Sequence, residues 1–305
     1  MPIARANGID IAYETAGNPD DPTILLVMGL GAQLTLWNEH FVSALAGHGL
    51  RVVMYDNRDT GLSSDFGAWG PADIPAAMAA AFTGKPITAP YTLTDMARDG
   101  IGLLDALGIA KAHVLGLSMG GMIVQLMAGW HRARVTSLTV VMSTSGRRGL
   151  PPGKPEAMKA LLTRPQTNDR EEIIRHAMSL RRIIGSPGYP PDEARLRAFV
   201  EKNVDRRYYP EGVGRQYVAV MASGDRVDLL KTITTPTLVI HGAEDPLLPP
   251  ECGRDVATLI PGARFDLIPG MGHDLPDELA ADLAARVAAH CQAAIPSAKT
   301  SAASA

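Results

Sequence analysis

The feature that most constrains the fold is an alternation of short strand-like runs with longer helical patterns. Most of the runs are apolar on both faces, as a parallel sheet buried between two layers of helices requires. The runs occupy residues 10–14, 23–28, 51–55, 112–116, 135–142, 237–241 and 263–268. The helical patterns occupy residues 37–46, 93–107, 121–129, 251–259 and 278–291. This order predicts an α/β fold with a mostly parallel central sheet flanked by helices.

One long segment, residues 143–225, interrupts the alternation. It is rich in proline and contains helix-like stretches but no convincing strand. It therefore predicts an inserted helical cap (lid), with residues 1–142 and 226–292 forming the core. Residues 65–90, rich in Ala, Gly and Pro, are expected to be irregular and to add to a rim near the site. Residues 293–305 are rich in Ala and Ser without periodicity, which predicts a disordered tail.

A five-residue pattern, Gly116-Leu117-Ser118-Met119-Gly120, joins an apolar strand to an apolar helix. In this context the pattern is typical of a nucleophile elbow, in which a serine is held on a tight, strained turn. Glycines two residues either side of the serine remove side chains that would collide with neighbouring backbone. The pattern therefore predicts that Ser118 is a catalytic nucleophile. The alternative is a glycine-rich turn with an inert serine.

A serine hydroxyl needs a base, and the base needs a group that orients it. Asp245 follows one late strand-like run and His273 follows the next, so both are expected at the carboxyl edge of the sheet. Their order after Ser118, acid and then histidine, is the order that the elbow predicts. Glu244 is the rival acid, and His241 is the rival base although it precedes the acid.

The developing oxyanion also needs donors that are already in position. We assign the backbone N–H groups of Met119, next to the nucleophile, and of Leu30, in the glycine-containing loop after an early strand. Met28 and Trp37 are candidate substrate-binding residues of an apolar pocket floor, which would favour a hydrophobic ester. For both, ordinary core packing is the alternative, and for Trp37 it is equally plausible.

Composition and charge limit the partners. The chain has 305 residues, a net charge of −3 and no long basic run, so we expect no nucleic-acid partner. Cys252 and Cys291 lie far apart without metal-ligand spacing, so we expect no disulfide framework and no metal. No signal-peptide pattern or membrane-length apolar run is present, which favours a cytoplasmic protein without a membrane partner. We also expect no cofactor. The sequence does not distinguish a monomer from a homodimer.

Five short motifs together resemble the α/β-hydrolase fold superfamily, and most of all its aclacinomycin methylesterase-like branch. In chain order they are Met28-Gly29-Leu30-Gly31, Asp56-Asn57-Arg58-Asp59-Thr60-Gly61-Leu62-Ser63, Gly116-Leu117-Ser118-Met119-Gly120-Gly121, Gly242-Ala243-Glu244-Asp245 and Gly272-His273. The resemblance implies a serine esterase whose inserted helices cap the active site. It also implies that Asp56 and Arg58 are structural. Many members carry His-Gly where this chain has Met28-Gly29, which changes the polarity of the pocket floor.

Three classes of function remain open at this stage. The first is hydrolysis of a carboxylic ester of a small, hydrophobic substrate through an acyl-enzyme. The second is another reaction of the same triad: cofactor-free haloperoxidation or perhydrolysis, lactone opening, or carbon–carbon bond hydrolysis. The third is a non-catalytic ligand receptor.

Overall fold

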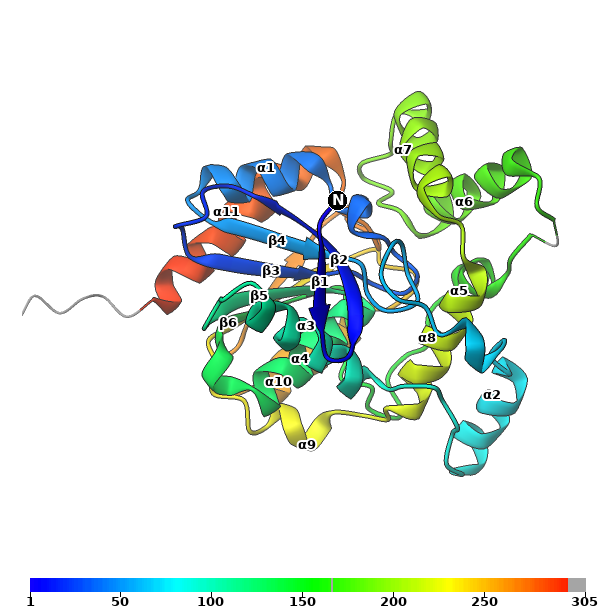
Figure 1. Ribbon diagram of the computed structural model, residues 1–305, viewed down its shortest axis with the longest axis horizontal. Coiled ribbons are helices and arrows are strands. Elements are labelled where there is room, and N and C mark those ends of the chain that lie inside the picture. Colours follow the sequence, from blue (N-terminus) through cyan, green and yellow to red (C-terminus); the bar gives the residue numbers. More distant parts are fainter. Residues whose placement is uncertain (166, 296–305) are drawn as a thin grey trace, which may run out of the picture.

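The fold centres on one sheet of parallel and antiparallel strands. The computed structural model describes residues 1–165 and 167–295 (Figure 1). Within them, eight strands pair in the order β1-β2-β4-β3-β5-β6-β7-β8. The β1–β2 and β2–β4 pairs are antiparallel and the others are parallel. The strands are β1 (Ile3–Ala6), β2 (Ile9–Ala16), β3 (Thr23–Val27), β4 (Arg51–Tyr55), β5 (Ala112–Leu117), β6 (Val135–Val141), β7 (Thr237–Gly242) and β8 (Arg264–Ile268).

Helices cover both faces of the sheet (Figure 1). On one face lie α1 (Glu39–Gly47) and α11 (Asp277–Ala294), and on the other α3 (Leu93–Ala106), α4 (Met119–Trp130) and α10 (Pro250–Leu259). Successive residues of a strand point to opposite faces, so an apolar run feeds two cores at once.

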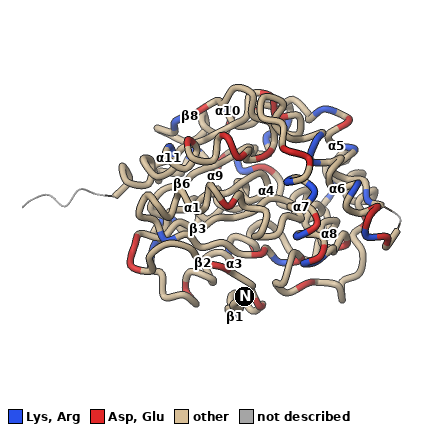
Figure 2. The backbone as a smooth tube through the Cα atoms, turned by 90° about the horizontal axis from the view of Figure 1, so that it is seen from above, with Lys and Arg blue, Asp and Glu red and all other residues tan. Residues whose placement is uncertain are grey.

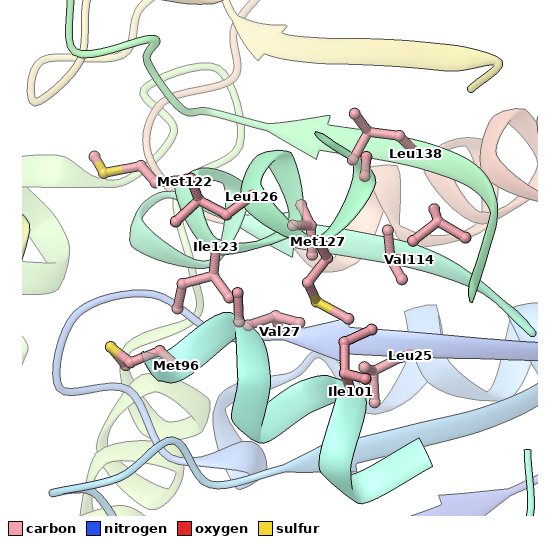
Figure 3. Packing of buried hydrophobic residues seen from close by; sticks show 14 of the residues in the cluster. Leu25, Val27, Met96, Ile101, Val114, Met122, Ile123, Leu126, Met127 and Leu138 are labelled. Carbon is pink, nitrogen blue, oxygen red and sulfur yellow. The ribbon is translucent and has the colours of Figure 1, made fainter. Parts of the chain in front are cut away.

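Strand β3 illustrates how the two cores are filled. Leu25 and Val27 belong to the cluster under α3 and α4, whereas Ile24 and Leu26 belong to the cluster under α1 and α11. Figure 3 shows the first cluster, in which strand residues meet Met96 and Ile101 of α3 and also Met122, Ile123, Leu126 and Met127 of α4. Full burial of such a side chain contributes about 1.5–3 kcal/mol, so this packing fixes α4 against the sheet.

The segment between β6 and β7 carries helices. Its described part contains α5 (Pro155–Leu162), α6 (Arg170–Ile184), α7 (Glu193–Arg206) and α8 (Pro210–Ala222), and α9 (Val227–Leu230) follows it. Figure 1 shows α6 and α7 standing away from the sheet. Helix α8 differs, because its Ala219 is fully buried in the core cluster under α3 and α4. We name residues 143–225 the insertion.

The sequence patterns missed several elements, among them the short edge strand β1 and the helices α8 and α2 (Ile74–Thr83). The expectation that residues 65–90 are wholly irregular is therefore wrong. Both helices have proline in their first turn. Proline breaks a helix interior but suits the first turn, where its missing N–H would be unbonded anyway, so these prolines mark helix starts.

Buried ion pairs dock the insertion onto the loop after β4. Arg215 of α8 binds Asp59 at 2.7 Å, and Arg206 at the end of α7 binds Asp56 at 2.6 Å. Arg58 pairs with Asp99 of α3 at 2.6 Å rather than with Asp56. Removing one partner of such a buried pair leaves an uncompensated charge, so these contacts hold the insertion in one position.

The end of the chain departs slightly from the predicted boundary. Helix α11 continues to Ala294, two residues into the segment expected to be disordered. The remainder of that segment, residues 296–305, lies outside the described residues. Across the part of the chain that the structure describes, no helix has the length and apolar character needed to span a bilayer.

Candidate active site

The predicted nucleophile lies at a strained turn between β5 and α4. Ser118 has φ +57° and ψ −118°, an unusual conformation for a residue with a side chain. Hydrogen bonds hold the turn on both sides. The Ser118 N–H donates to the carbonyl of Val141 at 2.9 Å, and the hydroxyl of Ser143 donates to the Ser118 carbonyl at 2.7 Å.

The two flanking glycines are required by close backbone contacts. A Cβ atom at Gly116 would lie 2.1 Å from the carbonyl oxygen of Gly120, and one at Gly120 would lie 2.0 Å from that of Val27. No side chain tolerates such distances, so the elbow depends on both glycines. Because α4 starts at Met119, the positive end of its dipole lies beside Ser118.

Asp245 and His273 lie side by side in the loops after β7 and β8. The Nδ1 atom of His273 is 2.7 Å from Oδ2 of Asp245, and the two residues are only 8% and 4% exposed. The other carboxylate oxygen of Asp245 accepts the backbone N–H groups of Leu247 and Leu248, each at 2.9 Å. The acid is therefore held from both sides, and it orients the imidazole.

Electrostatics keep Asp245 ionised. Burial alone raises its pKa, but the charge of His273 and hydrogen bonds from His241, His273 and the Leu248 amide more than offset this. The result is a pKa below the usual range of an aspartate. A carboxylate in this state stabilises a positive charge on His273.

His241, the rival base, lies in a different setting. It is fully buried, and its Nε2 lies 2.7 Å from the carbonyl oxygen of Leu248 and 3.5 Å from Asp245. Its Nδ1 packs against Gly253, where an added Cβ would lie 2.2 Å away. His241 therefore supports the acid loop from behind, a role that sequence order did not indicate. Glu244, the rival acid, is exposed.

The loop after β3 runs past the elbow. A Cβ at Gly29 would lie 3.1 Å from the Cβ of Ser118, so the two backbones nearly touch. Two residues after Gly29, the backbone N–H of Gly31 donates to the Gln216 side chain of α8 at 2.7 Å. Within residues 1–165 and 167–295, no hydrogen-bond partner is found for the backbone N–H of Leu30 or of Met119.

A cavity of about 880 Å³ separates the insertion from the sheet. Ser118 and His273 line it together with Leu30, Met119 and Met28, so five of the predicted site residues share one space. Asp245 lies behind His273. Helices α6, α7 and α8 supply much of the opposite wall. A cavity of this size suits a small organic molecule.

Trp37 does not join this set. It is 2% exposed, stacks on Phe41 with ring centroids 6.1 Å apart, and does not line the cavity. The expectation that it binds substrate is therefore wrong, and the alternative of core packing holds. Position along the chain put Trp37 near the loop after β3, but its side chain packs in the cluster between α1 and the sheet.

The structure offers no cluster for a metal ion within the residues it describes. Cys252 and Cys291 are both buried and unpaired with each other. Burial raises the pKa of the Cys252 thiol to about 11 and that of Cys291 to about 12, so neither is a reactive thiolate at neutral pH.

Comparison with known proteins decides the family. Residues 22–278 match the family described as alpha/beta hydrolase fold. The chain belongs to the α/β-hydrolase fold family. The parallel β3–β8 sheet and its flanking helices are those expected of this family, which confirms the predicted fold class.

Three relatives of this α/β hydrolase cover most of the chain. Rhodomycin D methylesterase DauP from Streptomyces sp. (strain C5) is 31% identical over 286 residues, covering 86% of this chain and 88% of DauP. Putative carbamate hydrolase RutD from Caulobacter sp. (strain K31) is 29% identical over 268 residues, covering 86% and 88%. The crystal structure of the enol-lactonase from Burkholderia xenovorans LB400 has a TM-score of 0.72 at 26% identity, covering 95% of this chain and all of the lactonase. The likeness to DauP agrees with the methylesterase-like branch that the motifs resemble.

Proposed function

We propose that this α/β hydrolase is a serine esterase that cleaves a carboxylic ester of a small molecule through an acyl-enzyme. The observation that carries the proposal is the buried 2.7 Å contact of His273 with Asp245 behind it. His273 and Ser118 line the same cavity. Ester hydrolysis is preferred among the triad reactions because DauP, the 31% identical relative, is a methylesterase.

Each residue has one task in the proposed mechanism. His273 takes the proton of the Ser118 hydroxyl as its oxygen attacks the ester carbonyl, and it later gives that proton to the leaving alcohol. Asp245 holds the proton of His273 on Nδ1 and stabilises the imidazolium. Water, activated by His273, then attacks the acyl-enzyme and releases the acid.

The oxyanion forms between the two backbone N–H groups of Leu30 and Met119. Support for this comes from their place on the cavity wall and from the lack of another partner for either group among the described residues. Gly31 is a poorer candidate, because its N–H already donates to Gln216. The start of α4 at Met119 adds the helix dipole to the same site.

A covalent probe tests the proposal directly. An alkyl fluorophosphonate places a tetrahedral phosphorus where the ester carbonyl would react, and we expect it to label Ser118 stoichiometrically, as read by mass spectrometry of the digested protein. Ser118→Ala should remain unlabelled. Labelling at another residue, or no labelling of a folded wild-type protein, would contradict the serine mechanism.

A lactone is a cyclic ester, and the likeness to the enol-lactonase makes lactone opening the second candidate. The same five groups would carry it out, with the leaving alcohol tethered to the acyl group. The two candidates separate on kcat/KM for a lactone and for its open-chain ethyl ester, and we expect the open-chain ester to be the better substrate.

Gln216 of α8 is expected to position the loop after β3, residues 28–31, which we call the oxyanion loop. It is fully buried, accepts from the Gly31 N–H at 2.7 Å, and donates to the Arg58 carbonyl and the Thr60 hydroxyl, each at 2.7 Å. Gln216→Met loses these bonds at similar side-chain length. We expect kcat to fall about tenfold with little change in KM, less than the roughly 10²- to 10³-fold loss of an oxyanion donor itself.

Gln125 provides the matched control for Gln216. It is also fully buried, and its side chain bonds to Arg226 at 3.0 Å and to the Thr144 carbonyl at 3.3 Å rather than to the oxyanion loop. Gln125→Met should lower the melting temperature without the same fall in kcat. Equal kcat losses in both variants would mean that Gln216 acts only through stability.

A further inference from the structure

The insertion turns one face of α6 toward the cavity. That face consists of residues three or four apart in sequence, as one side of a helix requires. Its members are Ile173, His176, Ala177, Leu180, Arg181 and Ile184. Figure 2 shows charged residues of both signs gathered around α5–α8. Among the α6 residues that line the cavity, Arg181 is the one with a charged side chain. The cavity is therefore apolar at its floor, where Met28, Leu30 and Met119 lie, and carries charge on its opposite wall.

Arg181 differs from three other cations that line the cavity. Arg195, Lys202 and Arg207 have carboxylate partners at 3.6, 2.8 and 2.7 Å. Among the described residues no carboxylate lies in ion-pair range of Arg181, and its guanidinium has no hydrogen-bond partner there. The guanidinium lies over the ring of Phe199, whose centroid is 5.2 Å from the guanidinium carbon.

The surroundings of Arg181 make this lack of a partner costly. Burial lowers the pKa of the guanidinium, and the charge of Asp274 offsets this only in part. Asp274 is engaged elsewhere, because it accepts a hydrogen bond from the Ser186 hydroxyl, and burial raises its pKa. A partly desolvated cation whose burial is only partly offset by a carboxylate beyond ion-pair range is unfavourable in a folded protein unless a ligand supplies more of the opposite charge.

Two further polar groups on the cavity wall lack partners. The Nε2 atom of His176 and the hydroxyl of Tyr208 are buried without a hydrogen-bond partner among the described residues. Both atoms can donate a hydrogen bond. Donors on the wall opposite Ser118 favour a ligand rich in acceptor oxygens.

We propose that the substrate is an anionic ester, with a carboxylate that binds Arg181 while its ester group lies at Ser118. The planar guanidinium offers two parallel N–H groups that match a carboxylate, and the Phe199 ring holds that plane in place. The apolar floor at Met28, Leu30 and Met119 contacts the chain between the two ends. This inference rests on the proposed esterase function and adds the class of substrate to it.

A pair of substrates that differ in one charge tests the proposal. Adipic acid monoethyl ester carries a free carboxylate, and diethyl adipate is its neutral counterpart. We expect wild type to prefer the monoester in kcat/KM, and Arg181→Met to lower that preference about 10- to 100-fold, as loss of a charged hydrogen bond implies. Arg181→Lys should keep part of the preference, because it retains the charge but not the fork.

Arg182 supplies the matched control, since it neighbours Arg181 on the same helix but is exposed and paired with Glu193. Arg182→Met should leave the preference unchanged. Equal preference for the two esters in wild type, or the same change in both Met variants, would overturn the proposal.

A binding measurement separates this inference from the esterase function. Calorimetry of the monoethyl ester with Ser118→Ala does not depend on turnover, and adding Arg181→Met should weaken Kd by a similar factor while adding Arg182→Met should not. Tight, Arg181-dependent binding without turnover in wild type would contradict the esterase function alone. Turnover of both esters without dependence on Arg181 would contradict only the anionic substrate.

Discussion

Replacing Ser118 with alanine is expected to lower kcat for a short p-nitrophenyl ester by about 10⁴- to 10⁶-fold, the size of loss seen when a serine nucleophile is removed. The reason is that Ser118 supplies the hydroxyl of the elbow, and it lines the same cavity as His273. Alanine keeps the Cβ, so the backbone at φ +57° is no more strained than before and the fold should persist.

The control for this variant is a second buried serine. Ser137 of β6 is fully buried and its hydroxyl lies 2.8 Å from His113, away from the cavity. Ser137→Ala should keep kcat close to that of wild type, with any effect appearing in the melting temperature. Equal rates for wild type and Ser118→Ala would exclude Ser118 as the nucleophile.

Asp245→Asn is expected to lower kcat by about 10⁴-fold, the loss found when the triad acid becomes an amide. The Asn oxygen would keep the N–H donors of Leu247 and Leu248, which leaves its NH₂ group facing His273. That group donates, so Nδ1 of His273 must accept and the ring proton moves to Nε2. An imidazole in that tautomer does not take the proton of Ser118.

Glu244→Gln is the matched control, because it makes the same chemical change at the exposed neighbour of Asp245. We expect it to retain wild-type kcat and stability. Circular dichroism of Asp245→Asn should show an intact fold, which separates a change of tautomer from unfolding. A larger loss in Glu244→Gln than in Asp245→Asn would transfer the acid role to Glu244.

Several features were predictable because their physics is local. Runs apolar on both faces can only be buried between two layers, so the parallel sheet followed from the pattern around β3, β5, β6 and β7. The glycines at 116 and 120 indicated that the backbone passes close to its neighbours there, and the short distances around Gly120 confirm this. The same reasoning misjudged α8, because a proline gives a different signal at the start of a helix than within one.

What the sequence determined by itself was the fold and the order of Ser118, Asp245 and His273 along it, since strand ends of a parallel sheet meet at one edge. What only the tertiary structure decided was how distant side chains meet. Trp37 packs into the core, and Gln216 reaches the loop after β3 from a position 185 residues away in sequence. Arg181 lines the cavity with no carboxylate in ion-pair range among the described residues. These outcomes depend on side-chain direction and on docking of the insertion, which no local pattern encodes.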